Sequence, residues 1–210
     1  MGRLSSAVTA EQRQALTALR AALPDGAYLA GGVAIAAALH HRISHDLDFF
    51  VPRDFEPERM SERLSAEVPG LTITSAAPGT LYFELHTVPS SLITERYPLL
   101  VQPSLHPELA VHVASLEDLI CMKLSAIAAR GLARDFWDLH ALLAHGIAGG
   151  SLAQALNLYR TKFASDDVGH VIRALAYFGD ADAAPLPRGL SASDWERIKR
   201  DVERHVTALG

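Results

Sequence analysis

The chain has 210 residues, of which 49% are hydrophobic, and its formal net charge is -5 at pH 7. This is enough for one large domain or two small ones with a real core, and the negative charge argues against a protein that binds nucleic acid over its whole surface. The single cysteine, Cys121, excludes an intramolecular disulfide. The early segment is polar and unlike a signal peptide, and no apolar run is long enough for a transmembrane helix, so we expect a cytoplasmic protein with no membrane partner.

The first half of the chain alternates predicted helices and strands. Residues 9–23 form an amphipathic pattern that opens with a Thr9/Gln12 capping box. The stretch from Tyr28 to Val51 follows the order strand, glycine turn, helix, strand. The other elements expected here are a surface helix over 57–68 and strands over 71–74, 81–85 and 91–94.

The pattern changes between Tyr97 and Pro107, where three prolines interrupt regular structure. We therefore expect an α+β protein, with a mixed sheet and flanking helices over residues 1–107 and a helical subdomain over residues 108–210 that completes the site. The helices expected in the second part span 115–130, 135–144, 152–163, 168–178 and 193–206.

Two acids stand on alternate positions of an apolar segment. Because side chains alternate along a strand, Asp46 and Asp48 are expected on one face and Leu47 and Phe49 on the other. Neighbouring carboxylates in a central strand are costly unless a cation lies between them. Hard cations such as Mg²⁺ take oxygen ligands, and two carboxylates can bridge a metal pair roughly 3.5 to 4 Å apart. This suits phosphoryl or nucleotidyl transfer, and the alternative is a solvated strand face.

A glycine turn precedes the acids. Gly31 and Gly32 let the backbone approach a phosphate and present amide groups at the start of a helix, although an isolated Gly-Gly pair is more often an ordinary tight turn. Arg42 and Ser44 stand just before the acids and could contact a triphosphate. An Arg42 side chain that pairs with Asp46 to hold the loop is an equal alternative.

A lysine lies on the apolar face of the helix expected over 115–130. At 100 degrees per residue, Lys123 falls in the middle of the apolar stripe, and a buried ammonium needs an anion. That anion is either a substrate phosphate or a structural carboxylate from Asp135 or Asp138, which share one face of the next helix. Asp135, near a helix start, could also simply satisfy backbone amides.

Taken together, these segments resemble the nucleotidyltransferase AbiEii/AbiGii toxin family. The resemblance covers roughly residues 27–145 and rests on an ordered set of segments. These are strand-Gly31-Gly32-helix, Arg42-x-Ser44-x-Asp46-Leu47-Asp48-Phe49, Leu116-Glu117-Asp118-Leu119, Lys123-Leu124-x-Ala126 and Arg130-Gly131-x-x-Arg134-Asp135-Phe136-x-Asp138-Leu139.

The resemblance implies a polymerase-β-like nucleotidyltransferase core followed by a helical region. It also implies transfer of a nucleotide from a nucleoside triphosphate with Mg²⁺, an acceptor that is RNA such as tRNA or a protein, and a cognate antitoxin. Carried over to this sequence, the family's metal ligands are Asp46 and Asp48. Its nucleotide contacts include Lys123, and Asp135 is the downstream acid.

One position departs from the family pattern. Members of the superfamily commonly place a further carboxylate on a later strand, and short relatives carry an Asp-Gly turn where this chain has His86-Thr87. Glu84, two residues earlier and expected on the same strand face as His86, is the candidate substitute.

The sequence therefore predicts a Mg²⁺-dependent nucleotidyltransferase with two metal ions. Because the third acid is missing, one alternative is a non-catalytic nucleotide-binding module that keeps the fold. Another is a helical scaffold whose acids are purely structural.

Overall fold

The computed structural model describes residues 7–210, and the chain divides into two compact units. The first unit runs through Pro98 and continues with Gln102–Ser115. The second consists of Leu99–Val101 and Leu116–Gly210. The first unit ends at Ser115, beyond residue 107, because two short strands after residue 103 pair with its sheet.

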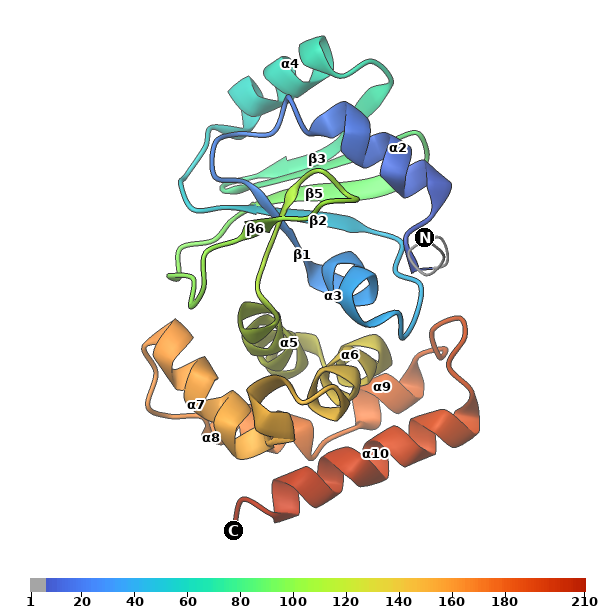
Figure 1. Ribbon diagram of the computed structural model, residues 1–210, viewed down its shortest axis with the longest axis vertical. Coiled ribbons are helices and arrows are strands. Elements are labelled where there is room, and N and C mark those ends of the chain that lie inside the picture. The colour runs from blue at the N-terminus through green and yellow to red at the C-terminus, as the bar shows by residue number, and fades with distance from the viewer. Residues whose placement is uncertain (1–6) are drawn as a thin grey trace. The chain divides into compact units, whose positions relative to one another are not determined.

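A seven-stranded mixed sheet forms the centre of the first unit (Figure 1). Its strand order is β3-β4-β5-β2-β1-β7-β6, so β2 lies in the middle. β2 is antiparallel to β1 and parallel to β5. The strands are β1 (Tyr28–Ala30), β2 (Leu47–Val51), β3 (Leu71–Ala77), β4 (Thr80–Leu85), β5 (Val88–Thr94), β6 (Ser104–Leu105) and β7 (His112–Val113). The predicted mixed sheet with helices is confirmed.

The described part of this unit contains the helices α2 (Ala10–Leu19), α3 (Gly31–Leu39) and α4 (Pro57–Glu67). The predicted capping box opens α2, with Thr9 and Gln12 bonded reciprocally. The Gln12 amide also donates to the carbonyls of Ser44 and His45, at 2.7 and 3.0 Å. This fixes the loop that enters β2.

The two faces of β4 differ sharply. Leu81, Phe83 and Leu85 are buried, whereas Tyr82 and Glu84 on the alternate positions are exposed. The helix α4 contacts β3 and β4 and buries its own apolar side chains. Because alternate residues of a strand point to opposite faces, the face that carries Tyr82 is open to solvent here.

The second unit is helical. Its elements are α5 (Leu116–Arg130), α6 (Ala133–Ala144), the 3₁₀ turn η1 (Ile147–Gly150), α7 (Leu152–Phe163), α8 (Gly169–Leu175), α9 (Gly179–Ala183) and α10 (Ala192–Thr207). An aromatic cluster of Phe136, Phe178 and Trp195 lies in its core, with ring centroids 5.0 to 5.9 Å apart. The five predicted helices are present, while α9 lies between two of them, where no helix was predicted.

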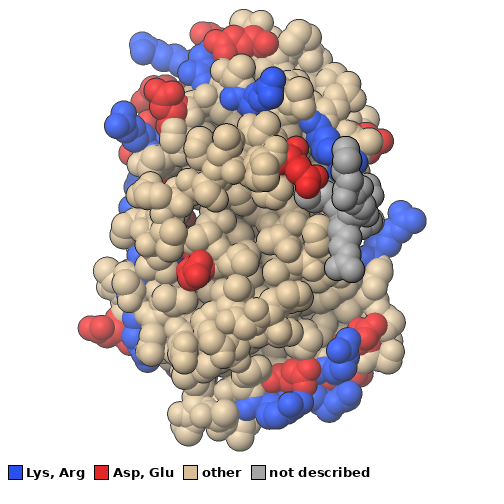
Figure 2. Space-filling model, viewed as in Figure 1, with Lys and Arg blue, Asp and Glu red and all other residues tan. Residues whose placement is uncertain are grey.

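Charges of both signs alternate on the surface helices. Figure 2 shows Lys and Arg next to Asp and Glu in the region of α10 and again near α4. On α10 these include exposed pairs three residues apart, such as Arg197 with Asp194 at 2.7 Å. Such pairs keep a helix soluble and add little stability. No helix within residues 7–210 combines the length and the apolar character that a membrane crossing requires.

Candidate active site

The glycine turn is tightly covered by side chains of the predicted site. Gly31, the first residue of α3, has φ of 67°, and a Cβ there would lie 2.5 Å from Asp48 Oδ2. A Cβ on Gly32 would meet Ser44 Oγ and would lie 2.5 Å from Arg42 Nη2. The positive φ of Gly31 favours glycine, and a side chain at either position would displace the carboxylate, hydroxyl or guanidinium groups that lie close to the backbone. The structure thus brings together five of the predicted site residues.

Asp48 lies inside β2, and Asp46 stands immediately before the first residue of this strand, Leu47. Both acids are half-buried. The Asp48 residue pairs with Ala30 on β1 and with Ser91 on β5, and its Oδ1 accepts a 2.8 Å hydrogen bond from Ser91 Oγ. The central position of the strand is as predicted, and a neutral hydroxyl orients the carboxylate.

The two acids suit a metal that is shared with a substrate. Mg²⁺ is usually held by one or two carboxylates together with substrate phosphates and water, and not by a cage of protein side chains. Within residues 7–210, no group of three or more His, Cys, Asp or Glu side chains is arranged to hold a metal ion. The Asp48 carboxylate, next to a glycine turn at a helix start, nevertheless fits Mg²⁺ that arrives with a triphosphate, and Asp46, two residues earlier, offers a second carboxylate.

The structure does not place Glu84 next to Asp48. Glu84 pairs with Pro89 of β5, so one whole strand separates it from β2. With neighbouring strands about 4.8 Å apart, its backbone lies roughly 10 Å from that of β2. The residue that faces Asp48 on the adjacent strand is Ser91.

His86 does not lie on the strand face of Glu84, as the sequence suggested, because β4 ends at Leu85. His86 and Thr87 form the two-residue turn between β4 and β5, and their φ angles are 50° and 67°. Positive φ at both central residues is the hairpin geometry that Asp-Gly normally adopts. His86-Thr87 therefore fills the backbone role of an Asp-Gly turn.

In the helical unit, Lys123 is held between two carboxylates. Its Nζ lies 3.0 Å from Asp135 Oδ1 and 2.7 Å from Asp138 Oδ2, and the lysine side chain is only 8% exposed. Of the two kinds of anion that the sequence left open for Lys123, the structure shows the carboxylates.

Asp135 receives a second cation. Arg130 Nε donates to its Oδ2 at 3.0 Å and Arg130 Nη2 to its Oδ1 at 3.1 Å. Burial by itself raises the pKa of this carboxyl, but the charges and hydrogen bonds of Lys123 and Arg130 outweigh burial and hold the pKa below its ordinary value. Asp135 is therefore ionised and saturated with donors, which makes it a poor general base.

A second buried ion pair was not predicted. Lys162 Nζ lies 2.8 Å from Asp118 Oδ1, and both side chains are 0% exposed. The Asp118 carboxylate also accepts the backbone N–H groups of Leu100 and Val101, at 3.0 and 3.1 Å. Asp118 thus ties the Leu99–Val101 segment to the start of α5.

The sequence did contain a signal for Lys162. Leu152, Ala155, Leu156 and Tyr159 form the buried stripe of α7, and Lys162 continues it at the same helical spacing. This is the pattern that singled out Lys123. Burial also raises the pKa of the neighbouring Cys121 thiol to about 12, so the thiol stays protonated and unreactive.

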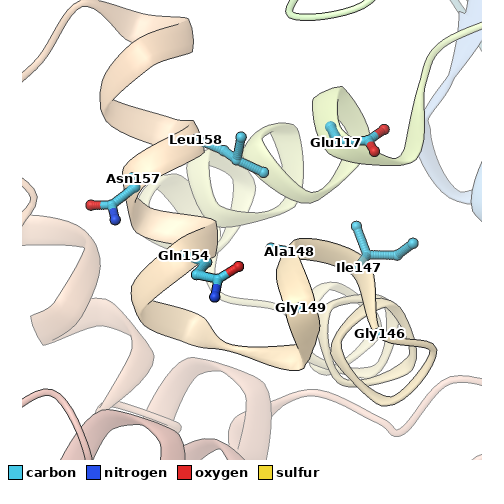
Figure 3. Close-up of a pocket in the computed structure, with 8 residues that line it drawn as sticks. All are labelled: Glu117, Gly146, Ile147, Ala148, Gly149, Gln154, Asn157 and Leu158. Carbon is cyan, nitrogen blue, oxygen red and sulfur yellow. The ribbon is translucent and has the colours of Figure 1, made fainter.

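A separate cavity of about 530 Å³ opens in the helical unit between the start of α5, the η1 turn and α7 (Figure 3). Among the described residues that line it, Glu117 is the only charged one. Gln154 extends from α7 toward the glycines of the turn in Figure 3. A single anionic side chain does not suit a triphosphate, so this cavity is no candidate for the nucleotide site.

The mixed sheet, with the glycine turn after β1 and with Asp46 and Asp48 at the start of β2, indicates a nucleotidyltransferase-type fold. Comparison with solved structures agrees. The nucleotidyltransferase toxin MenT4 from Mycobacterium tuberculosis H37Rv superposes with a TM-score of 0.65 at 19% identity, over 95% of this chain and 82% of that one. A putative nucleotidyltransferase from H. pylori superposes with a TM-score of 0.51 at 16% identity, over 94% and 96%.

Sequence comparison identifies the family. Residues 14–208 match the model of the nucleotidyl transferase AbiEii toxin of type IV toxin–antitoxin systems. An uncharacterized protein of Aquifex aeolicus (strain VF5) is 34% identical over 208 residues, which is 93% of this chain and 94% of that protein. The chain therefore belongs to the AbiEii nucleotidyltransferase toxin family, as its motifs suggested.

Proposed function

We propose that the protein transfers a nucleotide from a nucleoside triphosphate to an acceptor hydroxyl, with Mg²⁺ held by Asp46 and Asp48. The observation that carries this proposal is the covered glycine turn. There, the Asp48 carboxylate, the Arg42 guanidinium and the Ser44 hydroxyl lie close to the backbone at the start of α3. Amides at a helix start favour an anion, and the neighbouring carboxylate favours a cation. A metal–triphosphate complex satisfies both.

Each residue then has a defined part. The bound metal supplies Lewis-acid stabilisation of the charge that develops on the phosphate oxygens. Gly31 and Gly32 admit the phosphates close to the backbone, and Arg42 and Ser44 donate hydrogen bonds to them. Ser91 holds the Asp48 carboxylate in one orientation. Catalysis by such a site comes mainly from positioning and electrostatics.

The reaction is an in-line displacement. The acceptor oxygen bonds to the α-phosphorus, the bond to the bridging oxygen of the β-phosphate breaks, and pyrophosphate leaves. The hydroxyl proton must pass to a base or to water. Glu84 is the only acid on β4 or β5, and it remains our candidate for this base, reached through water since a strand separates it from β2.

We keep the prediction that Lys123 contacts the triphosphate. Its ammonium is shared by two carboxylates, so any phosphate contact must compete with Asp135 and Asp138. Lys123→Arg keeps the charge and Lys123→Met removes it. A loss of nucleotide affinity in Lys123→Met without a loss of fold would support the contact.

The toxin family also motivates the biological part of the proposal. We infer that the protein acts as the toxin of a toxin–antitoxin pair, that its acceptor is RNA such as tRNA or a protein, and that a cognate antitoxin counteracts it. Growth arrest on expression, relieved by the neighbouring reading frame, would test this.

The direct test uses labelled nucleoside triphosphates, Mg²⁺, total tRNA and a protein extract. Wild type should label an acceptor, and Asp46→Ala/Asp48→Ala should not. Asp54→Ala, which removes an exposed acid of the same unit, is the matched control and should label like wild type. Equal labelling by wild type and Asp46→Ala/Asp48→Ala would contradict the proposed transferase activity.

A non-catalytic nucleotide-binding module is the second candidate. The observation in its favour is that Ser91, and not a carboxylate, faces Asp48 on the adjacent strand. Calorimetry separates the two. Tight triphosphate binding without turnover, unchanged in Glu84→Gln, would favour the module.

A further inference from the structure

One aromatic side chain stands on the open face of the sheet. Tyr82 of β4 is 47% exposed, although it lies inside a strand whose neighbouring residues Leu81 and Phe83 are fully buried. An exposed tyrosine on a strand presents an apolar ring with a polar hydroxyl, which can stack against a planar group of a ligand. The proposed phosphate chemistry gives Tyr82 no part.

The strand register connects Tyr82 to the metal site. Tyr82 pairs with Ser91 of β5, and Ser91 pairs with Asp48 of β2. Residues that pair directly across strands point to the same face, so Tyr82 and Asp48 stand in one row on one face. Two strand spacings of about 4.8 Å separate their backbones by roughly 10 Å.

The neighbours of Tyr82 in this row are small. Ser91 precedes it on β5, and Ser75 follows it on β3. Neither side chain is large enough to cover the ring, which is 47% exposed. Such a ring can stack against another planar group.

We propose that Tyr82 is a positioning residue for the acceptor, and that it stacks against the terminal base of a single-stranded nucleic acid whose ribose hydroxyl reaches the metal site. This inference rests on the proposed transferase function. Stacking on an aromatic side chain is the usual way in which proteins hold unpaired bases.

The row spacing argues against Tyr82 as the acceptor itself. A phenol that attacked the α-phosphorus would have to approach to about 3 to 3.5 Å, whereas the strands that carry Tyr82 and Asp48 are roughly 10 Å apart. A gap of that size is better filled by one nucleotide lying between the ring and the metal.

The charge of the same face limits which part of a nucleic acid can lie there. Glu84, exposed two residues from Tyr82, repels phosphate groups. Its carboxylate can accept hydrogen bonds from a ribose hydroxyl or from the amino group of a base. The phosphodiester backbone should therefore stay away from this end of the face, while the terminal base and sugar occupy it.

The experiment measures KM and kcat for a short single-stranded RNA acceptor. Loss of one stacking contact corresponds to a rise of about 5- to 150-fold in KM, with a smaller change in kcat. Tyr82→Ala and Tyr82→Leu should show this rise, and Tyr82→Phe should behave like wild type. Tyr97→Ala, which removes an equally exposed tyrosine outside the strands, is the control.

The affinity for the triphosphate should be unchanged in every Tyr82 variant. If Tyr82→Leu transfers nucleotides to RNA with the KM of wild type, or if wild type modifies only proteins, the inference is overturned and the transferase proposal stands. If wild type transfers nothing, the transferase proposal fails. Fluorescence anisotropy with a labelled oligonucleotide then decides the role of Tyr82, since weaker binding by Tyr82→Leu supports stacking and equal binding refutes it.

Discussion

Two pairs of aspartates of similar spacing occupy very different surroundings in this molecule. Asp46 and Asp48, at β2 of the sheet unit, are half-buried, and a neutral hydroxyl orients Asp48. Asp135 and Asp138, on α6 of the helical unit, are 0% exposed and share the ammonium of Lys123. Arg130 also binds Asp135.

The difference shows that the role of an aspartate depends on whether neighbouring cations already compensate its charge. A buried carboxylate between cations is a structural group, because its lone pairs are filled and its charge is compensated. A half-buried carboxylate over a glycine turn is still in contact with solvent, from which a metal and a substrate arrive. We therefore expect changes in the helical unit to reduce stability first, and changes around β2 to reduce activity first.

The largest effect on stability should come from Lys162→Met. This substitution leaves the 0% exposed Asp118 without its ammonium, and breaking a fully buried ion pair typically costs about 3 to 5 kcal/mol. Urea unfolding measures the change. Arg197→Met, which removes an exposed pair with Asp194, should cost about 1 kcal/mol or less. Similar losses for the two variants would contradict the structural reading of the buried pair.

Asp135→Asn should also destabilise the fold, and this loss should depend on pH. The pKa of Asp135 is lowered in the folded protein, whereas in the unfolded chain it is about 4. Its ionised form therefore stabilises the fold above about pH 4, and this contribution is lost as the pH falls from there through the folded-state pKa.

The measurement is the free energy of unfolding at pH 7 and near pH 3. The difference between wild type and Asp135→Asn should be about 3 kcal/mol at pH 7 and smaller at the lower pH. A difference in the free energy of unfolding that grew on acidification would contradict a lowered pKa of Asp135 in the folded protein.

Gly31→Ala should damage activity more than stability. A side chain at φ of 67° costs about 1 to 2 kcal/mol, and its Cβ would displace the Asp48 carboxylate. A shift of a catalytic group by about 1 Å can reduce the rate about 100-fold. Gly79→Ala is the matched control for Gly31→Ala, because Gly79 has a similar φ of 68° but its Cβ would meet Thr94. It should lose similar stability and keep its rate.

The smallest effect is expected for Ser91→Ala. The hydroxyl donates one hydrogen bond to Asp48 Oδ1, and its loss should cost about 1 kcal/mol and lower the rate by about tenfold or less. The adjacent Ser90, whose hydroxyl bonds only to the Val88 carbonyl among the contacts described, is the control. If Ser90→Ala lowered the rate as much as Ser91→Ala, the loss of rate in Ser91→Ala could not be explained by a changed orientation of Asp48.

Much of this arrangement was predictable from local patterns. The order of strand, glycine turn, helix and strand follows from the local pattern of apolar residues and glycines. The apolar stripe of the helix over 115–130 correctly indicated that Lys123 is buried. Residue pairs distant in sequence were not predictable. The bond from Ser91 to Asp48 depends on parallel pairing of β2 with β5, and the pair of Asp118 with Lys162 joins helices 44 residues apart.

Short elements were missed for a physical reason. β6 and β7 have two residues each, which is too few to show a period, and their strand geometry comes from pairing with the sheet. His86-Thr87 has no glycine, so its residue types do not indicate a hairpin turn with two positive φ angles. This is why His86 was expected on a strand face.

The central claim is that the acids of β2, and not those of α6, bind the metal–nucleotide complex. Isothermal titration of a non-hydrolysable nucleoside triphosphate, with and without Mg²⁺, tests it in wild type, Asp48→Asn and Asp138→Asn. The account predicts Mg²⁺-dependent binding that Asp48→Asn abolishes and Asp138→Asn leaves largely intact in a folded protein. Wild-type affinity in Asp48→Asn, or loss of binding only in Asp138→Asn, would contradict it.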